Sequence, residues 1–281
     1  FRPERPFSPG HEGAGIVSSV GEGVKTHKVG DNVAFFKRFG AFAEKIVLSE
    51  ALAFSIPNNF PHSVAAGVFM VYGTSYHALV QRAKITKDDE VLVLGASGGV
   101  GLAAVDIAKS FGARVVVAVS TKEKADVCKR YGVDDVVVYG KEKLDQEGQK
   151  IFTKELKSKS TRGGFSIIYD PIGDCFAEPA LRSIGWGGTY LVVGFAAGKI
   201  PSFPTNLMLL KGCAVSGVFI GRFQQEEPKQ SAQNIKEIGD LLSSGKLTPF
   251  ISETIPMAKS IDAIERIAKR GVVGKVVFVN N

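Results

Sequence analysis

The chain has 281 residues, 44% of them hydrophobic, which is long enough for a sizeable buried core divided over about two domains. Its net charge of +7 could suit nucleic acid, but the lysines are spread along the chain without an arginine-rich block or interleaved aromatic residues, so we expect no dedicated nucleic-acid role. We expect no membrane span and find no signal-peptide pattern. The three cysteines are far apart and odd in number, which argues for a reducing compartment such as the cytoplasm: Cys128, Cys175 and Cys213.

The first part of the chain, up to about residue 72, predicts a small barrel-like β domain. Short apolar segments at 14–20, 31–36 and 43–48 are separated by glycine turns. Residues 61–80 carry apolar side chains at mixed spacing, and we expect helices there that lead into the next domain.

A strand, a tight turn and a helix are predicted in the middle of the chain. The apolar run 90–94 enters a glycine-rich turn that reads A-x-G-x-x-G, with Ala96 at the first glycine position. Gly98 would let a pyrophosphate approach the backbone, and Gly101 would let the helix pack on the strand. The N–H groups and dipole of the helix start form an anion site. The turn therefore predicts a dinucleotide site that includes Ala96, Ser97, Gly98, Gly99 and Val100.

The remainder of the chain alternates strands and helices, which indicates a parallel, doubly wound sheet. A helix over 122–131 is expected to stop at Gly132, and Ser231 is expected to cap a helix that ends at Gly245. A short helix over 261–268 follows. Further strands are predicted at 114–119, 135–138, 165–169, 189–193, 214–218 and 275–279.

The end of the strand predicted at 114–119, the second strand of the dinucleotide-binding domain, indicates which dinucleotide binds. An NAD site carries Asp or Glu there to accept from the ribose 2′-OH, whereas this chain has a hydroxyl and lysines: Ser120, Lys122 and Lys124. Lysines on a solvated helix face are the ordinary alternative. Because the acid is missing at the same place, the pattern favours NADPH.

Several segments together resemble a known family. They are 9–15 (PGHEGAG), 30–33 (GDNV), 95–101 (GASGGVG), 169–173 (YDPIG), 206–211 (NLMLLK) and 274–277 (GKVV). The chain resembles the medium-chain dehydrogenase/reductase superfamily, in its zinc-free quinone oxidoreductase (ζ-crystallin-like) branch. This resemblance implies an α/β fold with a GroES-like β-barrel catalytic domain in two parts, 1–72 and 223–281, around a doubly wound Rossmann NADPH-binding domain, 73–222.

The resemblance also implies roles for individual residues. Ser120 and Lys124 match positions that grip the 2′-phosphate, Tyr139 matches one near the adenosine, and Thr74 matches one near the nicotinamide. The remaining implied cofactor contacts are Gly194, Phe195, Val218, Phe219 and Lys275.

Two acidic or metal-binding candidates are given structural roles. His11 in G-H-E matches a zinc ligand of related alcohol dehydrogenases, but the cysteine that such enzymes supply between Val68 and Tyr72 is absent, so we expect no metal site. Asp170 ends a strand before Pro171 and Gly173, and its carboxylate is expected to cap or fix that turn rather than to act in catalysis.

These features predict an NADPH-dependent reductase of quinones or related conjugated carbonyls, with Thr74 placing the nicotinamide and Tyr72 as the visible candidate for proton donation. The alternatives are an enoyl-thioester reductase and a noncatalytic, crystallin-like protein that binds NADPH and RNA. The apolar segment 212–220 should form an edge strand that pairs two chains in a homodimer. Because the chain opens with Phe1 and lacks the family's first strand, we expect an upstream segment that completes the active site, which leaves a mitochondrial location as an alternative.

Overall fold

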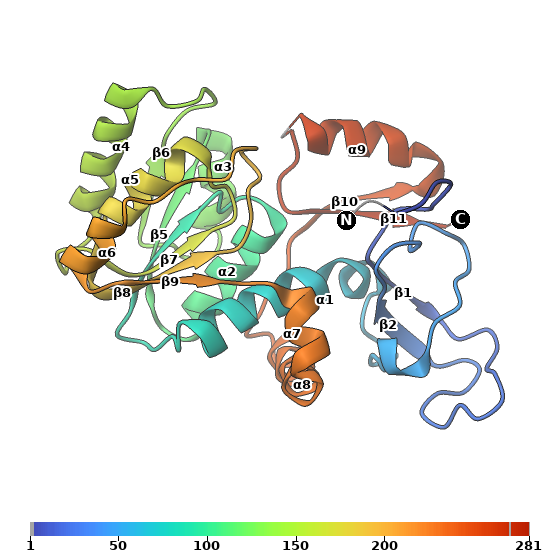
Figure 1. The fold of residues 1–281 in the computed structure, drawn as a ribbon. Coiled ribbons are helices and arrows are strands. Elements are labelled where there is room, and N and C mark those ends of the chain that lie inside the picture. Colours follow the sequence, from blue (N-terminus) through green and yellow to red (C-terminus); the bar gives the residue numbers. More distant parts are fainter. Residues whose placement is uncertain (1–2, 270, 281) are drawn as a thin grey trace. The chain divides into compact units, whose positions relative to one another are not determined.

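The computed structural model describes residues 3–269 and 271–280, which form two compact units (Figure 1). One unit combines the segment up to Met70 with the segment from Pro249 onward, and the other is the continuous segment Val71–Thr248. Residues 223–248, assigned from the sequence to the return into the first domain, thus lie in the second unit. The functional roles of the two domains stay a prediction.

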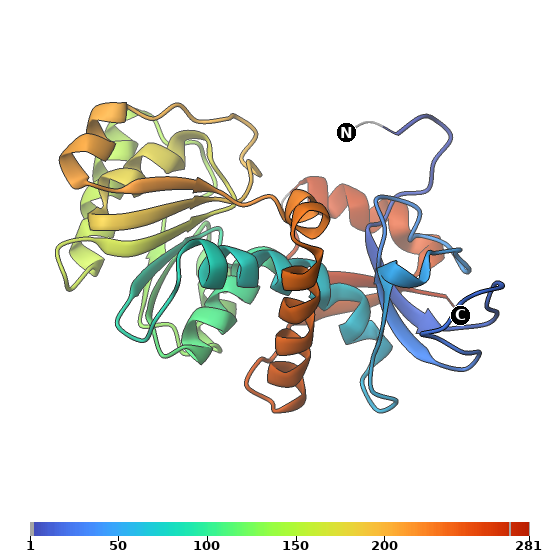
Figure 2. The ribbon, with the colours of Figure 1, turned by 60° about the horizontal axis from the view of Figure 1, so that its bottom comes forward.

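The second unit is built on a six-stranded parallel sheet in the order β6-β5-β4-β7-β8-β9. The predicted doubly wound sheet is confirmed. Strand β4 is buried along its whole length, as expected for a central parallel strand, and β9 lies at one edge (Figures 1 and 2). The strands are β4 (Glu90–Leu94), β5 (Arg114–Val119), β6 (Asp135–Val138), β7 (Phe165–Asp170), β8 (Ile184–Val192) and β9 (Ala214–Gly217).

Helices cover both faces of this sheet. On one face, Leu92 and Leu94 belong to a buried cluster with side chains of α4, α5 and α6, whereas α2 and α3 pack on the sheet outside that cluster. Thr121 and Asp145 cap α3 and α4 by accepting from backbone N–H groups of the first turn. The helices are α2 (Gly99–Ser110), α3 (Lys122–Lys129), α4 (Gln146–Lys159), η3 (Asp174–Phe176), α5 (Ala177–Arg182) and α6 (Thr205–Lys211).

Two more helices follow β9: α7 (Ile220–Glu226) and α8 (Pro228–Ser243). The predicted cap at Ser231 is wrong, because α8 begins earlier with a proline in its first turn, where a missing N–H costs nothing. The predicted stop at Gly245 is confirmed by its positive φ of 71°.

Helix α1 (His62–Tyr76) continues into a π-helical segment, η2 (His77–Arg82). The run His62–Arg82 is long and apolar enough to cross a membrane by those two criteria alone. However, 72% of the 18-residue apolar window within this run is buried in the fold, as in a core helix.

The first unit contains a three-stranded antiparallel sheet and a two-stranded parallel sheet. The strand predicted at 43–48 is wrong: residues 43–45 form bends and 46–48 form no regular structure, and Val47 is 87% exposed. Strands β3 and β10 were not predicted. The elements are β1 (Glu12–Ile16), β2 (Asn32–Phe36), η1 (Glu50–Leu52), β3 (Ala53–Ser55), β10 (Ile251–Pro256), η4 (Met257–Lys259), α9 (Ser260–Ala268) and β11 (Lys275–Val279).

Candidate dinucleotide-binding site

The glycine-rich turn joins β4 to α2 in the geometry that a phosphate loop requires. Gly95 adopts a positive φ of 56°, so the tight turn is made one residue before Ala96. A Cβ on Gly101 would lie 2.6 Å from the Gly95 carbonyl oxygen, which confirms that a glycine is needed for close packing of helix on strand. A Cβ on Gly98 would meet nothing closer than 3.6 Å, so Gly98 leaves room on its open side.

The first turn of α2 forms an anion site. Gly98 caps the helix with an extended backbone and without a side chain, and the first turn carries no acidic residue. Backbone N–H groups there lie at the positive end of the helix dipole. This geometry fits a pyrophosphate.

The end of β5 brings together the two residues assigned to the 2′-phosphate. Lys124 Nζ donates to Ser120 Oγ at 3.2 Å, and the Lys124 backbone N–H donates to Thr121 Oγ1 at 3.3 Å. Glu123 is exposed in the same turn, and its hydrogen bond with Thr121 lowers its pKa. An ammonium beside a hydroxyl suits a phosphate monoester better than a ribose hydroxyl.

Asp170 holds the turn that follows β7. Its Oδ1 accepts from the N–H groups of Ile172 (2.8 Å) and Gly173 (2.9 Å), and its Oδ2 accepts from the Tyr190 hydroxyl at 2.6 Å. The predicted structural role is therefore confirmed. The side chain is 2% exposed, and burial raises its pKa despite the three donors.

The Asp170 turn supports the phosphate loop. A Cβ on Gly95 would lie 2.6 Å from Ile172 Cγ2, so the two turns pack directly on each other. The loop after β8 joins them, because the Gly194 N–H donates to the Asp170 carbonyl oxygen at 3.3 Å. Three loops thus form one connected edge at the carboxyl ends of β4, β7 and β8, where doubly wound sheets bind ligands.

The remaining assigned residues of this unit lie on elements around that edge. Tyr139 follows β6 and packs on Phe176, with ring centroids 4.6 Å apart. Phe195 is 40% exposed and Phe219, after β9, is 58% exposed, whereas Val218 is buried.

Thr74 immediately precedes Ser75, which is bonded to the first turn of α2. It is 7% exposed, and the neighbouring Ser75 hydroxyl contacts both the Val100 carbonyl oxygen (2.9 Å) and the Tyr169 hydroxyl (2.8 Å). These bonds hold this part of α1 against the helix that carries the phosphate loop.

Tyr72 has a buried structural partner. Its hydroxyl donates to Asp106 Oδ2 at 2.6 Å, and the side chain is 3% exposed. Burial raises the pKa of this phenol well above its usual range, and the nearby Asp106 carboxylate raises it further. The geometry favours a core role, and proton donation by Tyr72 stays a prediction.

Lys275 lies in the other unit. Its Nζ is 2.6 Å from Glu12 Oε1, and Glu12 Oε2 also accepts from the Met70 N–H at 2.9 Å. This pair ties β1, α1 and β11 together within that unit. A role of Lys275 toward the cofactor stays a prediction. Among residues 3–269 and 271–280, no three His, Cys, Asp or Glu side chains are grouped to hold a metal.

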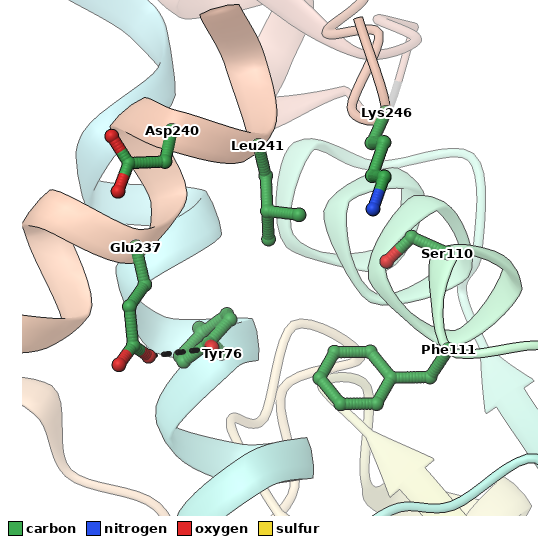
Figure 3. Close-up of a pocket in the computed structure, with 7 residues that line it drawn as sticks. All are labelled: Tyr76, Ser110, Phe111, Glu237, Asp240, Leu241 and Lys246. Atoms are coloured by element: carbon green, nitrogen blue, oxygen red, sulfur yellow. Dashed lines mark hydrogen bonds between the residues drawn. The ribbon is translucent and has the colours of Figure 1, made fainter. Parts of the chain in front are cut away.

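A separate cavity of about 320 Å³ lies at the opposite end of α2 from the phosphate loop (Figure 3). The hydrogen bond from the Tyr76 hydroxyl to Glu237 Oε2, 2.7 Å long, forms one side of it. The cavity is not part of the dinucleotide site, since α2 is roughly 18 Å long. Its lining includes Tyr76, Ser110, Phe111, Glu237, Leu241 and Lys246.

Sequence reasoning missed the partners of the buried polar groups. Asp106, Ser75 and Tyr190 each form a hydrogen bond with a residue that is distant in the sequence. Neither periodicity nor a local motif can therefore predict these hydrogen bonds. A polar residue inside the apolar stretch of α2 was the available signal for Asp106.

The fold, together with the three loops at the carboxyl ends of β4, β7 and β8, defines the class of protein. It has a GroES-like unit and a Rossmann unit with a dinucleotide-binding loop. The family model for the alcohol dehydrogenase GroES-like domain matches residues 1–58, and the model for the zinc-binding dehydrogenase matches residues 99–237.

Curated relatives and solved structures agree with this class. Quinone oxidoreductase-like protein 2 homolog of Nematostella vectensis is 32% identical over 99% of this chain and 74% of its own length, and the Mus musculus protein is 32% identical over 99% and 77%. Mycobacterial Rv1454c complexed with NADPH has a TM-score of 0.90 at 27% identity, covering 99% of this chain and 84% of that one. Escherichia coli quinone oxidoreductase complexed with NADPH has a TM-score of 0.87 at 26% identity, covering 98% and 84%. The chain therefore belongs to the quinone oxidoreductase-like family of the medium-chain dehydrogenase/reductase superfamily.

Proposed function

We propose that the protein is an NADPH-dependent reductase that transfers hydride to quinones or related conjugated carbonyls. The observation that carries the cofactor assignment is the contact between Lys124 Nζ and Ser120 Oγ at the end of β5, where an NAD site would hold a carboxylate. Relatives named quinone oxidoreductase, and neighbours solved with NADPH, support the reaction type.

The chain's residues bind and orient, and the reduced nicotinamide supplies the hydride. The α2 N-terminus would hold the pyrophosphate, Ser120 and Lys124 the 2′-phosphate, and Thr74 the nicotinamide end. A quinone accepts hydride readily, and the product oxygen can take its proton from water. The reaction therefore requires no strong acid from the protein.

A substrate panel tests this proposal. NADPH consumption should be measured with small quinones, enones and enoyl thioesters, using NADH as the comparison cofactor. We expect quinones to be reduced fastest. Preference for enoyl thioesters would move the assignment to that class of reductase, and NADPH binding without turnover of any acceptor would refute an enzymatic role.

Tyr72→Phe tests whether the phenol is an essential acid. We expect quinone turnover to stay within about tenfold of the wild type, well short of the ten-thousandfold that general-acid catalysis can reach. Turnover and NADPH affinity should be measured together. A thousandfold loss of turnover with unchanged affinity would show that the phenol is required, and would favour enones or thioesters, whose carbanions must be protonated.

We also propose a homodimer in which two sheets join through β9. Residues 213–220 contain no charged side chain, and β9 has one neighbour, β8, in the described sheet. An edge strand without charges is a template for pairing with another chain. Exposed apolar residues lie on this strand, in the segment after it, and on β8 and α6: Trp186, Leu209, Leu210, Val215 and Phe219.

Val215→Lys tests the dimer, because a lysine on the edge strand opposes pairing. We expect the wild type to sediment as a dimer at micromolar concentration and Val215→Lys as a monomer. Val47→Lys, at a highly exposed position of the other unit, is the control and should leave the dimer intact. A monomeric wild type would contradict the proposal.

The location we propose is the cytoplasm. Its support is that all three cysteines are free thiols, as is usual in a reducing compartment.

A further inference from the structure

The chain passes between the two compact units twice, and both passages are bonded to the same side chain. The first passage, from Met70 to Tyr72, lies inside helix α1, and the second, from Thr248 to Phe250, lies outside helices and strands. Asp106 Oδ2 accepts from the Tyr72 hydroxyl at 2.6 Å and from the Thr248 N–H at 2.7 Å. These bonds lie within the Rossmann unit, at the last points before the chain leaves it.

Asp106 is well placed to fix these points. It is 6% exposed on α2, in a run of buried residues from Gly101 to Ala108. Thr248 is held from a second side as well, because its carbonyl oxygen accepts from the Tyr131 hydroxyl at 2.8 Å. Pro249 follows Thr248, and its ring restricts the φ angle next to the bonded peptide.

The same helix carries the phosphate loop. Its first turn forms the anion site, and Asp106 lies about two turns further along, roughly 10 Å away. Close packing of Gly101 on Gly95 makes loop and helix one rigid element. One helix, α2, therefore carries both the anion site for the cofactor phosphates and the side chain that is bonded to the two passages.

We propose that Asp106 is the anchor of a hinge: its carboxylate fixes α1 at Tyr72 and the exit of the chain at Thr248 relative to the helix that carries the phosphate loop. Asp106 acts through other residues and is a positioning residue. Hinge positions of this kind change kcat and KM together while lying away from the reacting atoms. The kinetic consequence rests on the proposed reductase function, whereas the anchoring does not.

Limited trypsin digestion tests the anchoring without reference to activity. Lys246 is exposed but Leu247 is 2% exposed, so cleavage after Lys246 requires local release of the second passage. In Asp106→Ala, which leaves both donors unpaired, we expect cleavage there to be at least tenfold faster. Asp106→Asn retains an acceptor oxygen and should restore the wild-type rate. Tyr72→Phe removes one bond and should give an intermediate rate, about threefold faster.

Glu90→Ala is the matched control. Glu90 is also a buried carboxylate of the same unit, and its partners Ser160, Thr161 and Arg114 belong to neither passage. It should lower the unfolding midpoint without accelerating cleavage after Lys246. Equal acceleration in Glu90→Ala and Asp106→Ala would overturn the hinge anchor, as would cleavage in Asp106→Asn as fast as in Asp106→Ala.

Kinetics supply the second readout. With quinone as acceptor, Asp106→Ala should lower kcat at least tenfold and shift KM for quinone, while the Kd of NADPH changes less than threefold. Unchanged kcat and KM in a folded Asp106→Ala would overturn the positioning role. If the wild type reduced no quinone, the reductase proposal would fail, and the digestion result alone would decide the anchor.

Discussion

Asp170→Ala should lower the free energy of unfolding by about 3 to 5 kcal/mol, since it leaves three donors without an acceptor, two of them buried and one part-buried. Each such group costs about 1 to 3 kcal/mol when unpaired. Because the Asp170 turn packs on Gly95, the variant should also bind NADPH more weakly. Denaturant unfolding and cofactor titration measure the two effects. A loss below about 1 kcal/mol would contradict the assigned bonds.

Asp170→Asn separates this structural role from a catalytic one. An amide oxygen can still accept from Ile172 and Gly173, and the Tyr190 hydroxyl can rotate to accept from the amide nitrogen. We expect stability at pH 7 and quinone turnover close to those of the wild type. Loss of turnover in a stable Asp170→Asn would instead indicate that the carboxylate takes part in the reaction.

The pH dependence of the same pair follows from the raised pKa of Asp170. A carboxyl whose pKa is raised by folding contributes stability below its unfolded pKa, near 4, and loses that contribution as pH rises through the folded value. The wild type should therefore lose stability relative to Asp170→Asn as pH rises from about 4. An equal pH dependence in both proteins would contradict the raised pKa.

The Rossmann unit was readily predicted from the sequence because its signals are local and repeated. Residues 114–119 and 135–138 form strands with the predicted bounds, since buried parallel strands are uninterrupted apolar runs between turns. The turn after β4 was recognisable because its glycines are required by contacts between residues close in the sequence, such as that between Gly101 and Gly95.

The first unit was harder to predict because its strands are short and half-exposed. Residues 43–48 end in the apolar run Ile46, Val47 and Leu48, which favours a strand, yet they pair with nothing in the described sheets. Strand β10 mixes strand formers with Glu253 and Pro256, which are unfavourable in strands, and it pairs in parallel with β11, which begins about 20 residues after β10 ends. Pairing with a distant partner decides such elements, and local composition does not carry that information.

The contacts of the candidate site likewise differ in whether the sequence could predict them. Ser120 and Lys124 lie on adjoining turns, so their meeting could be predicted from the end of β5 and the start of α3. The bonds of Asp106 to Tyr72 and Thr248 join three distant segments, and only the folded chain brings them together.

Lys124→Ala should weaken NADPH binding by roughly 10- to 150-fold, about 1.5 to 3 kcal/mol, while NADH binding stays nearly unchanged. The physical reason is that the ammonium lies beside Ser120 and would make a charge-assisted hydrogen bond that only the 2′-phosphate can accept. The helix itself should be unaffected, because Thr121 caps it through the Lys124 backbone N–H. Fluorescence titration of both cofactors measures the selectivity.

Lys122→Ala is the matched control for this prediction, because it removes an equal charge from an exposed position two residues away. If general electrostatic attraction were responsible, both variants would lose NADPH affinity alike, and the loss would shrink as salt screens the charges. A specific contact predicts instead that Lys122→Ala changes NADPH affinity less than about threefold at physiological salt. Equal losses of NADPH and NADH affinity in Lys124→Ala would show that the lysine serves the fold, and the 2′-phosphate assignment would then have to move to another residue.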